Sequence, residues 1–285
     1  MSQKIAGMSS GDPVPAITER DATGEIAELY ADIRSTLGVP LVNLIWRNLA
    51  TMPGALAWAW LSVKPLYETG QIQNEAVALM ECLQLPGAPQ LPNSALRAVG
   101  IYAADERVIR GIINSYDRSN PLNLVALCVL LAILRNESPE IVARPATAKP
   151  QPTLNVALPA LVNLHETSDD IAELVRAVNR LGARGRDHIL VSMPRHLAHW
   201  PGFLALYWAV IAPVDASGEL HDCIDAVLSD GRARGARLAA VADKSQQPPD
   251  ESRAIIEATL DDFCRNAISR MIPVVSLLKK AMPST

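Results

Sequence analysis

Two stretches of this chain repeat each other at a fixed separation of 148 residues. Arg47 corresponds to Arg195 at this separation, and Pro53–Gly54 corresponds to Pro201–Gly202. The other identities pair Leu49 with Leu197, Ala50 with Ala198, Leu56 with Leu204, Ala57 with Ala205, Trp60 with Trp208, Pro65 with Pro213 and Gly70 with Gly218. Ten identities in one window, with prolines, glycines and a tryptophan in register, indicate an internal duplication.

A second match lies upstream of this window. Residues 26–29 and 171–174 both read Ile-Ala-Glu-Leu, at a separation of 145, and a short insertion explains the difference. Between the two copies, residues 138–159 contain five prolines, a density that prevents a continuous helix. The sequence therefore predicts a first helical repeat at 1–137, a Pro-rich linker at 138–159 and a second helical repeat at 160–285.

Helical periodicity dominates both copies. Apolar residues recur three and four positions apart in residues 25–37, 74–85, 106–116 and 169–181, and no segment shows the sustained alternation of a half-buried strand. We therefore predict an all-α fold of two pseudo-symmetric helical repeats packed around a central cleft. A cleft between two such units is a natural place for a small ligand.

Composition narrows the possible partners and surroundings. Apolar residues make up 49% of the chain and charged residues 20%, with a net charge of −4, so we expect a packed core and no nucleic-acid or membrane partner. The amino-terminal residues lack the apolar region of a signal peptide, which predicts a cytoplasmic protein. The four cysteines form no CxxC pair, so we expect buried reduced thiols.

Three groups of side chains could have a functional role, but their positions in the sequence favour a structural one. His196 and His199 lie three residues apart, but no third residue has convincing metal-ligand spacing, so we predict no metal site. Arg47 and Arg195 occupy the same place in both copies, so we expect each to pair within its own unit. The tryptophans that follow the repeated prolines, Trp58, Trp60 and Trp208, are expected in the core.

Asn120–Pro121 precedes the most apolar segment of the chain and allows two interpretations. Asn is a favoured helix N-cap and Pro suits the first helical position, which predicts a helix beginning here. Alternatively, an amide at the mouth of a buried helix can orient a water molecule. Capping preferences favour the first interpretation.

Three segments resemble the group I 2-haloacid dehalogenases, which act on D- and L-substrates. They are residues 24–60, residues 114–121 (NSYDRSNP) and residues 195–214 (RHLAHWPGFLALYWAVIAPV). They occur in the family's order, and the duplicated all-α architecture with a long linker is also similar. A more distant likeness is to the carboxymuconolactone decarboxylase-like helical units, whose redox CxxC motif is absent here.

The resemblance implies a hydrolase that uses water and no cofactor. In that family an Asp activates a water molecule that attacks the halogen-bearing carbon directly, without an ester intermediate. The resemblance carries the water-positioning Asn onto Asn120 and the catalytic Asp onto Met193. It implies a homodimer and a substrate site formed by Leu41, Leu44, Asn123 and Ser192.

Met193 is the departure from the family pattern. A thioether cannot accept a proton from water at neutral pH, and loss of a general base costs about 10²–10⁴-fold in rate. Asp117, one turn before Asn120, and Asp187, six residues before Met193, are speculative replacements. The sequence thus leaves two hypotheses: a dehalogenase-like hydrolase of small 2-substituted carboxylic acids with an altered site, or a non-catalytic small-ligand-binding protein with the same cleft.

Overall fold

The computed structural model describes residues 14–137, 153–154, 156–185 and 189–284, and within them the regular structure is helical. The predicted all-α class is confirmed. The α-helices are α1 Gly24–Leu37, α2 Leu44–Leu49, α3 Ala55–Glu68, α4 Gln71–Cys82, α5 Asn93–Ala98, α6 Ala103–Leu134, α7 Asp169–Arg180, α8 Ser192–Leu197, α9 Pro201–Ala216, α10 Glu219–Ala239, α11 Arg253–Phe263 and α12 Ser269–Ala281. A short 3₁₀ helix, η1 Asp250–Ser252, precedes α11, and a π-helical turn, η2 Cys264–Ile268, joins α11 to α12.

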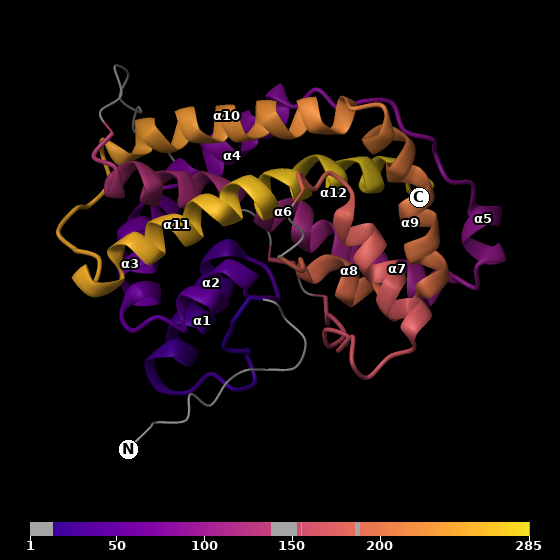
Figure 1. Ribbon diagram of the computed structural model, residues 1–285, viewed down its shortest axis with the longest axis horizontal. Coiled ribbons are helices and arrows are strands. Elements are labelled where there is room, and N and C mark those ends of the chain that lie inside the picture. The colour runs from indigo at the N-terminus through magenta and orange to yellow at the C-terminus, as the bar shows by residue number, and fades with distance from the viewer. Residues whose placement is uncertain (1–13, 138–152, 155, 186–188, 285) are drawn as a thin grey trace.

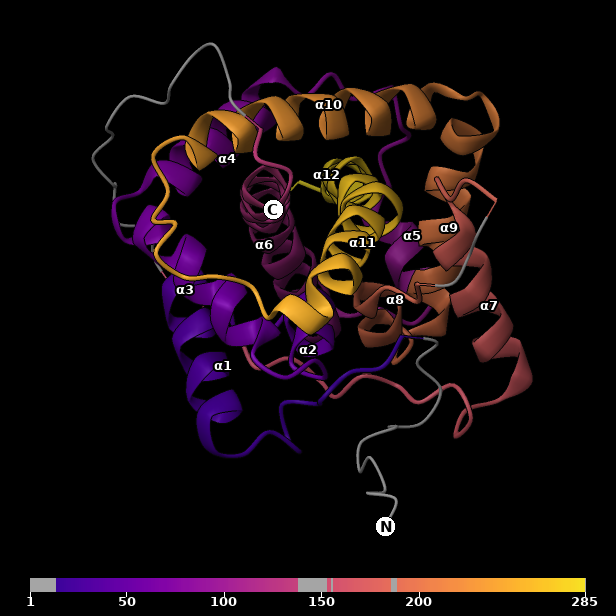
Figure 2. The same cartoon turned by 60° about the vertical axis from the view of Figure 1, so that its left-hand side comes forward.

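Helices α6, α11 and α12 form the centre of the molecule. In Figures 1 and 2, α1–α3 lie on one side of them and α7–α9 on the other, while α4 and α10 run along a third side. Residues 119–132 of α6 are all buried. This arrangement places the middle of α6 between the two flanking groups of helices.

Helix α6 is also the helix, among the described residues, that could span a membrane by length and apolar composition. Helices α9 and α10 would pass the same test only as a single span bent by 84°. In the folded chain, 83% of the most apolar window of α6 is buried against protein, as expected for the core helix of a globular domain.

Two glycines let α10 lie directly against α6. A Cβ atom added at Gly235 would lie 2.4 Å from the Cβ and 2.5 Å from the carbonyl carbon of Cys128. At Gly231 it would meet the side chain of Leu124 at 2.9 Å. Both glycines lie inside one helix of 21 residues.

The predicted helix start at Asn120 is wrong. Asn120 and Pro121 lie in the interior of α6, which continues for 17 residues on the amino-terminal side of Asn120. Pro121 removes one backbone N–H donor there. Packing against α4, α10 and α12 on several sides holds the helix together across the proline. Asn120 is therefore not a cap, and its side-chain amide does not bond to a helix end.

Corresponding helices begin at the repeat separations seen in the sequence. Helices α2 and α8 begin 148 residues apart, and α1 and α7 begin 145 apart. The glycines before α4 and α10, Gly70 and Gly218, both have positive φ angles, of 75° and 86°. Residues 138–152 and 155 of the predicted linker lie outside the described residues, and the described part, 153–154 and 156–159, is not helical.

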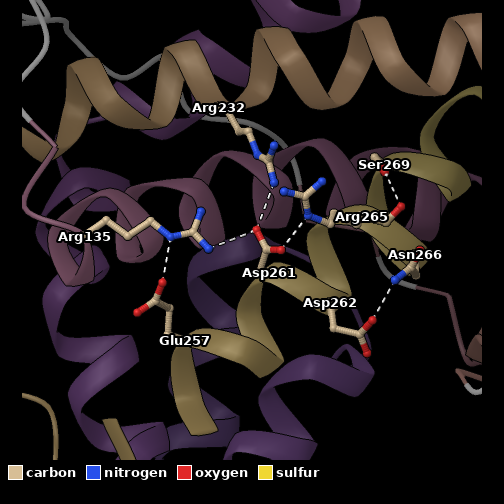
Figure 3. Close-up of polar contacts among 8 residues, drawn as sticks. All are labelled: Arg135, Arg232, Glu257, Asp261, Asp262, Arg265, Asn266 and Ser269. Atoms are coloured by element: carbon tan, nitrogen blue, oxygen red, sulfur yellow. Dashed lines mark hydrogen bonds and ion pairs between the residues drawn. The ribbon is translucent and has the colours of Figure 1, made fainter. Parts of the chain in front are cut away.

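An ion-pair cluster ties α11 and η2 to the rest of the molecule (Figure 3). The Asp261 carboxylate of α11 accepts hydrogen bonds from Arg135 after α6, Arg232 of α10 and Arg265 of η2. Arg135 also pairs with Glu257 at 2.8 Å. One carboxylate shared by three separate elements fixes the position of the π-helical turn relative to α6.

Two expectations about burial need correction. Trp58 and Trp60 are buried, but Trp208 is 47% exposed. Cys128, Cys223 and Cys264 are buried free thiols as expected, whereas Cys82, at the end of α4, is exposed.

Candidate functional site

A small cavity lies between the middle of α6, the start of α8 and the π-helical turn η2. Its volume is about 40 Å³, enough for roughly three water molecules at about 10–15 Å³ each. We refer to it as the inner cavity. Its apolar lining residues are Leu44, Ile45, Ile189, Val191, Met193, Phe263, Ala267, Ile268 and Met271, and its polar lining residues are Asn43, Tyr116, Asn120 and Ser192.

Two buried amides in this wall have unused hydrogen-bonding atoms. Asn43 donates from Nδ2 to Ser119 Oγ at 3.1 Å, and its Oδ1 has no partner among the described residues. Asn120 is 5% exposed, and its Nδ2 likewise has no partner there. Buried polar groups are normally satisfied by protein or by water. Two residues in the wall of the inner cavity thus carry an acceptor and a donor without partners among the described residues.

Met193 forms part of the apolar wall. It is the second residue of α8 and is fully buried. Among the described residues that line the inner cavity, none is Asp or Glu. The groups available near a bound water molecule are therefore amides, hydroxyls and a thioether, which are all weak proton acceptors at neutral pH.

A larger, more polar pocket adjoins the inner cavity. It has a volume of about 460 Å³, and we refer to it as the outer pocket. Tyr116 and Ser192 line both spaces. The charged residues around the outer pocket are Glu19, Arg20, Arg47, Glu166 and Arg195. An apolar chamber thus lies beside a charged one, with two hydroxyl groups at their common wall.

Arg47 of α2 connects the two groups of flanking helices. Its Nε donates to the Val42 carbonyl at 3.1 Å, within its own group, as the sequence predicted. Its Nη2 also donates to Ser192 Oγ at 3.1 Å, which the prediction of pairing within one unit did not include. Arg195 of α8 makes the bond corresponding to the first, from Nε to the Val162 carbonyl at 2.9 Å.

Tyr116 and His196 form a buried pair in the wall of the outer pocket. The hydroxyl of Tyr116 lies 3.1 Å from His196 Nδ1. Burial, together with the charges of Arg47 and Arg195, lowers the pKa of His196 to about 3. Burial also raises the pKa of Tyr116 far above its ordinary value. Both side chains are neutral at pH 7, and His196 is too weak a base to replace a carboxylate.

Comparison with proteins of known activity identifies the family. A configuration-inverting 2-haloacid dehalogenase from Alcaligenes xylosoxydans xylosoxydans is 30% identical over 218 residues, covering 73% of this chain and 71% of the relative. The chain belongs to the 2-haloacid dehalogenase family. An (R)-2-haloacid dehalogenase from Pseudomonas putida is 31% identical over a shorter stretch, 33% of each chain. A scan against models of known protein families finds no match.

Solved structures of 2-haloacid dehalogenases share this fold. A D-2-haloacid dehalogenase mutant superimposes with a TM-score of 0.73 at 16% sequence identity, over 98% of this chain and 99% of its own. The complex of such a mutant with D-2-CPA gives a TM-score of 0.69 at 17% identity, over 96% and 97%. The likeness extends over nearly the whole length of both chains.

The dehalogenase-like residues predicted from the sequence fall in different places. Asn120, Met193, Ser192 and Leu44 line the inner cavity, and Leu41 lines the outer pocket. These five are brought together around two adjoining spaces, so the sequence resemblance did lead to a single region of the fold. Their chemical roles stay predictions.

The other three predicted residues do not line either space in the described structure. Asn123 is fully buried one turn beyond Asn120 and accepts a hydrogen bond from Trp46 Nε1 at 2.9 Å. Asp117 pairs with Lys279 at 2.6 Å and accepts from Ser276. Asp187 lies outside the described residues. The roles proposed for Asp117 and Asp187 as bases stay predictions.

Sequence reasoning missed several residues that line the inner cavity. Tyr116 lies within the segment 114–121 that carried the resemblance, four residues before Asn120 and on the same helix face. Asn43, just before α2, lies within the first resembling segment. Phe263 and Met271 flank the π-helical turn. No sequence signal marks such a turn, although π turns in other proteins often occur at functional sites.

Proposed function

We propose that this chain is a dehalogenase-like hydrolase whose inner cavity holds a water molecule beside C2 of a small 2-substituted carboxylic acid. The observation that carries the proposal is the pair Asn120 and Met193 in the wall of one cavity. Asn120 offers an unpartnered amide donor to a water molecule, and Met193 takes the position of the family's Asp. Family membership supports the reaction class, and the cavity supports a small substrate.

The proposed reaction is a single displacement at C2. A water oxygen forms a bond to C2 as the carbon–halogen bond breaks, the halide leaves with the bonding electron pair, and one water proton is lost. Attack from the face opposite the halogen inverts C2. The relative from Alcaligenes xylosoxydans xylosoxydans is named as a configuration-inverting enzyme.

The proton of the attacking water has no carboxylate acceptor in the described wall of the inner cavity. Met193 offers only a thioether, and His196 is a weak base because its pKa is about 3. In the proposed reaction the proton passes to solvent, and the chain is a slow catalyst compared with an enzyme that has an Asp at this position. We expect its rate of halide release to be about 10²–10⁴-fold lower than that of such an enzyme.

A second candidate function is binding of a small ligand without turnover. The absence of Asp and Glu among the described lining residues of the inner cavity favours it. The two candidates share the cavity and the ligand class, and they differ in whether halide is released.

We also propose, as finer parts of this account, two pseudo-symmetric helical repeats around a central cleft, a cytoplasmic location and a homodimer. Equivalent hydrogen bonds support the repeats: Ile17 N donates to the Arg47 carbonyl at 3.0 Å, and Val162 N donates to the Arg195 carbonyl at 3.3 Å. These donors lie 145 residues apart, the separation found for α1 and α7. The location and the homodimer rest on the sequence and the family resemblance alone.

Halide release from D- and L-2-chloropropionate distinguishes the two candidates. We expect slow release by the wild type and a loss of about 10–100-fold in Asn120→Ala, on the scale of one oriented hydrogen bond at about 1.5–3 kcal/mol. Asn266→Ala is a matched control, because its amide bonds to Asp262 away from the cavity. No release by folded wild-type protein would favour the binding protein, and equal rates in wild type and Asn120→Ala would remove Asn120 from the mechanism.

A further inference from the structure

Arg47 is a buried cation whose described partners are neutral. It is 5% exposed and lines the outer pocket. Its hydrogen bonds run to the Val42 carbonyl and to Ser192 Oγ, and no carboxylate among the described residues forms an ion pair with it. Removing a charge from water is costly unless an opposite charge lies nearby. The burial of Arg47 therefore predicts that an anion binds beside it in the outer pocket.

The two carboxylates that line this pocket have described partners other than Arg47. Glu19 pairs with Arg34 and accepts from the backbone N–H of Val42 at 2.9 Å. Glu166 accepts from Asn163 Nδ2 at 2.8 Å. Arg195 also lines this pocket and donates from Nε to the Val162 carbonyl. Neither glutamate of the pocket forms an ion pair with Arg47.

The sizes of the two spaces indicate the shape of the anion. Ser192 lines both the outer pocket and the inner cavity, and its hydroxyl accepts from Arg47 Nη2. A charged group beside Arg47 thus lies next to a mostly apolar space of about 40 Å³, which holds a small apolar group or a few water molecules. A short monocarboxylate satisfies both spaces, with its charge outside and its small apolar group inside.

We infer that Arg47 is the carboxylate anchor of the ligand. The guanidinium of Arg47 binds the carboxylate in the outer pocket. C2 and its methyl group then lie at Ser192 and Tyr116 and face Asn120 and Met193, while the halogen points away from the inner cavity. The identity of the ligand as a 2-substituted acid rests on the proposed function. The anchor itself rests on the burial and the neutral partners of Arg47. The ligand class is short-chain monocarboxylates, and the uncharged amides of the same acids are excluded.

Propionate and propionamide test the anchor without any reaction, because neither carries a leaving group. We would titrate each into the full-length wild type by calorimetry, at constant ionic strength. The expected result is an affinity at least tenfold higher for propionate than for the amide of the same shape. Equal affinities, or no binding of propionate, would overturn the inference.

Variants assign the charge preference to Arg47. We expect Arg47→Gln to weaken propionate binding at least tenfold and to leave propionamide binding unchanged. We expect Arg47→Lys, which keeps the positive charge, to retain part of the higher affinity for propionate over propionamide. Arg234→Gln is the matched control, because Arg234 is a similarly buried guanidinium that pairs with Asp230 and Glu75 on α10 and α4. Unchanged propionate affinity in both Arg47 variants would overturn the assignment. If propionate binds through Arg47 but no halide is released from 2-chloropropionate, the hydrolase proposal fails and the anchor stands.

Discussion

At the scale of single residues, the wall of the inner cavity combines hydrogen-bonding capacity with a lack of basicity. Asn43 and Asn120 supply polar atoms without partners among the described residues, whereas Met193, which we propose takes the place of the family's Asp, supplies only a thioether. The neighbouring His196 is neutral because burial and two guanidinium groups oppose its protonation. The site can thus orient a water molecule but cannot readily take its proton.

The low pKa of His196 predicts a loss of stability in acid. In the unfolded chain a histidine titrates near pH 6.5, whereas in the folded chain His196 titrates at about 3. Between these values the unfolded state binds more protons, so the free energy of unfolding falls as the pH drops from about 6.5 toward 3. We expect the free energy of unfolding, measured by chemical denaturation from pH 7 to pH 4, to fall less steeply with decreasing pH in His196→Gln than in the wild type. Replacement of the exposed His165 should leave the wild-type pH dependence unchanged. Equal slopes in wild type and His196→Gln would contradict the pKa.

Local rules applied to the sequence succeeded for some of these residues and failed for others. The resemblance led to Asn120, Met193, Ser192 and Leu44 around one cavity, since Leu44 and Asn120 lie in matching segments and Ser192 and Met193 lie just before the third. Capping preference alone gave Asn120 the wrong structural role, because a proline inside a helix can be outweighed by packing on several sides. Tyr116 was missed, since its spacing in the sequence does not show that its hydroxyl lies between two pockets; that depends on how α6 packs against α8.

At the scale of elements, the cavity depends on how closely helices approach each other. Helix α10 lies against α6 through Gly231 and Gly235, and the ion pairs of Asp261 hold α11 and η2 beside α6 (Figure 3). Helix periodicity predicted α1, α4 and α7 to within a few residues. It could not predict the π-helical turn or the role of the two glycines, because both depend on contacts with a distant segment.

Substitution of Gly235 tests the close approach of α10 to α6. In Gly235→Ala the new methyl group would meet the backbone of Cys128, which cannot move aside as a side chain can. We expect a loss of about 1–3 kcal/mol in the free energy of unfolding. Gly87→Ala is the matched control, since nothing lies within 4 Å of a Cβ placed at Gly87. If chemical denaturation gives the same midpoint for both variants, the two helices are not in contact at Gly235.

At the scale of the whole molecule, the proposed duplication explains why the site lies where it does. Helices α2 and α8 begin 148 residues apart and carry Arg47 and Arg195 into one pocket, and the central helix α6 separates the two flanking groups (Figure 2). The sequence could predict this repeat from its identities alone. It could not predict that the two arginines would line a common pocket, because that depends on how the flanking groups pack against α6.

The central claim is that this dehalogenase-like cavity retains its shape and its water-binding amide but lacks a base at Met193. The most direct test compares halide release from D- and L-2-chloropropionate by the wild type and by Met193→Asp, both shown to be folded. We predict that Met193→Asp increases the rate about 10²–10⁴-fold. Met193→Leu, and Met271→Asp on another wall of the same cavity, should give no such increase. No gain in folded Met193→Asp would contradict the account, since a carboxylate at the right place in an intact dehalogenase cavity should take the proton of the attacking water.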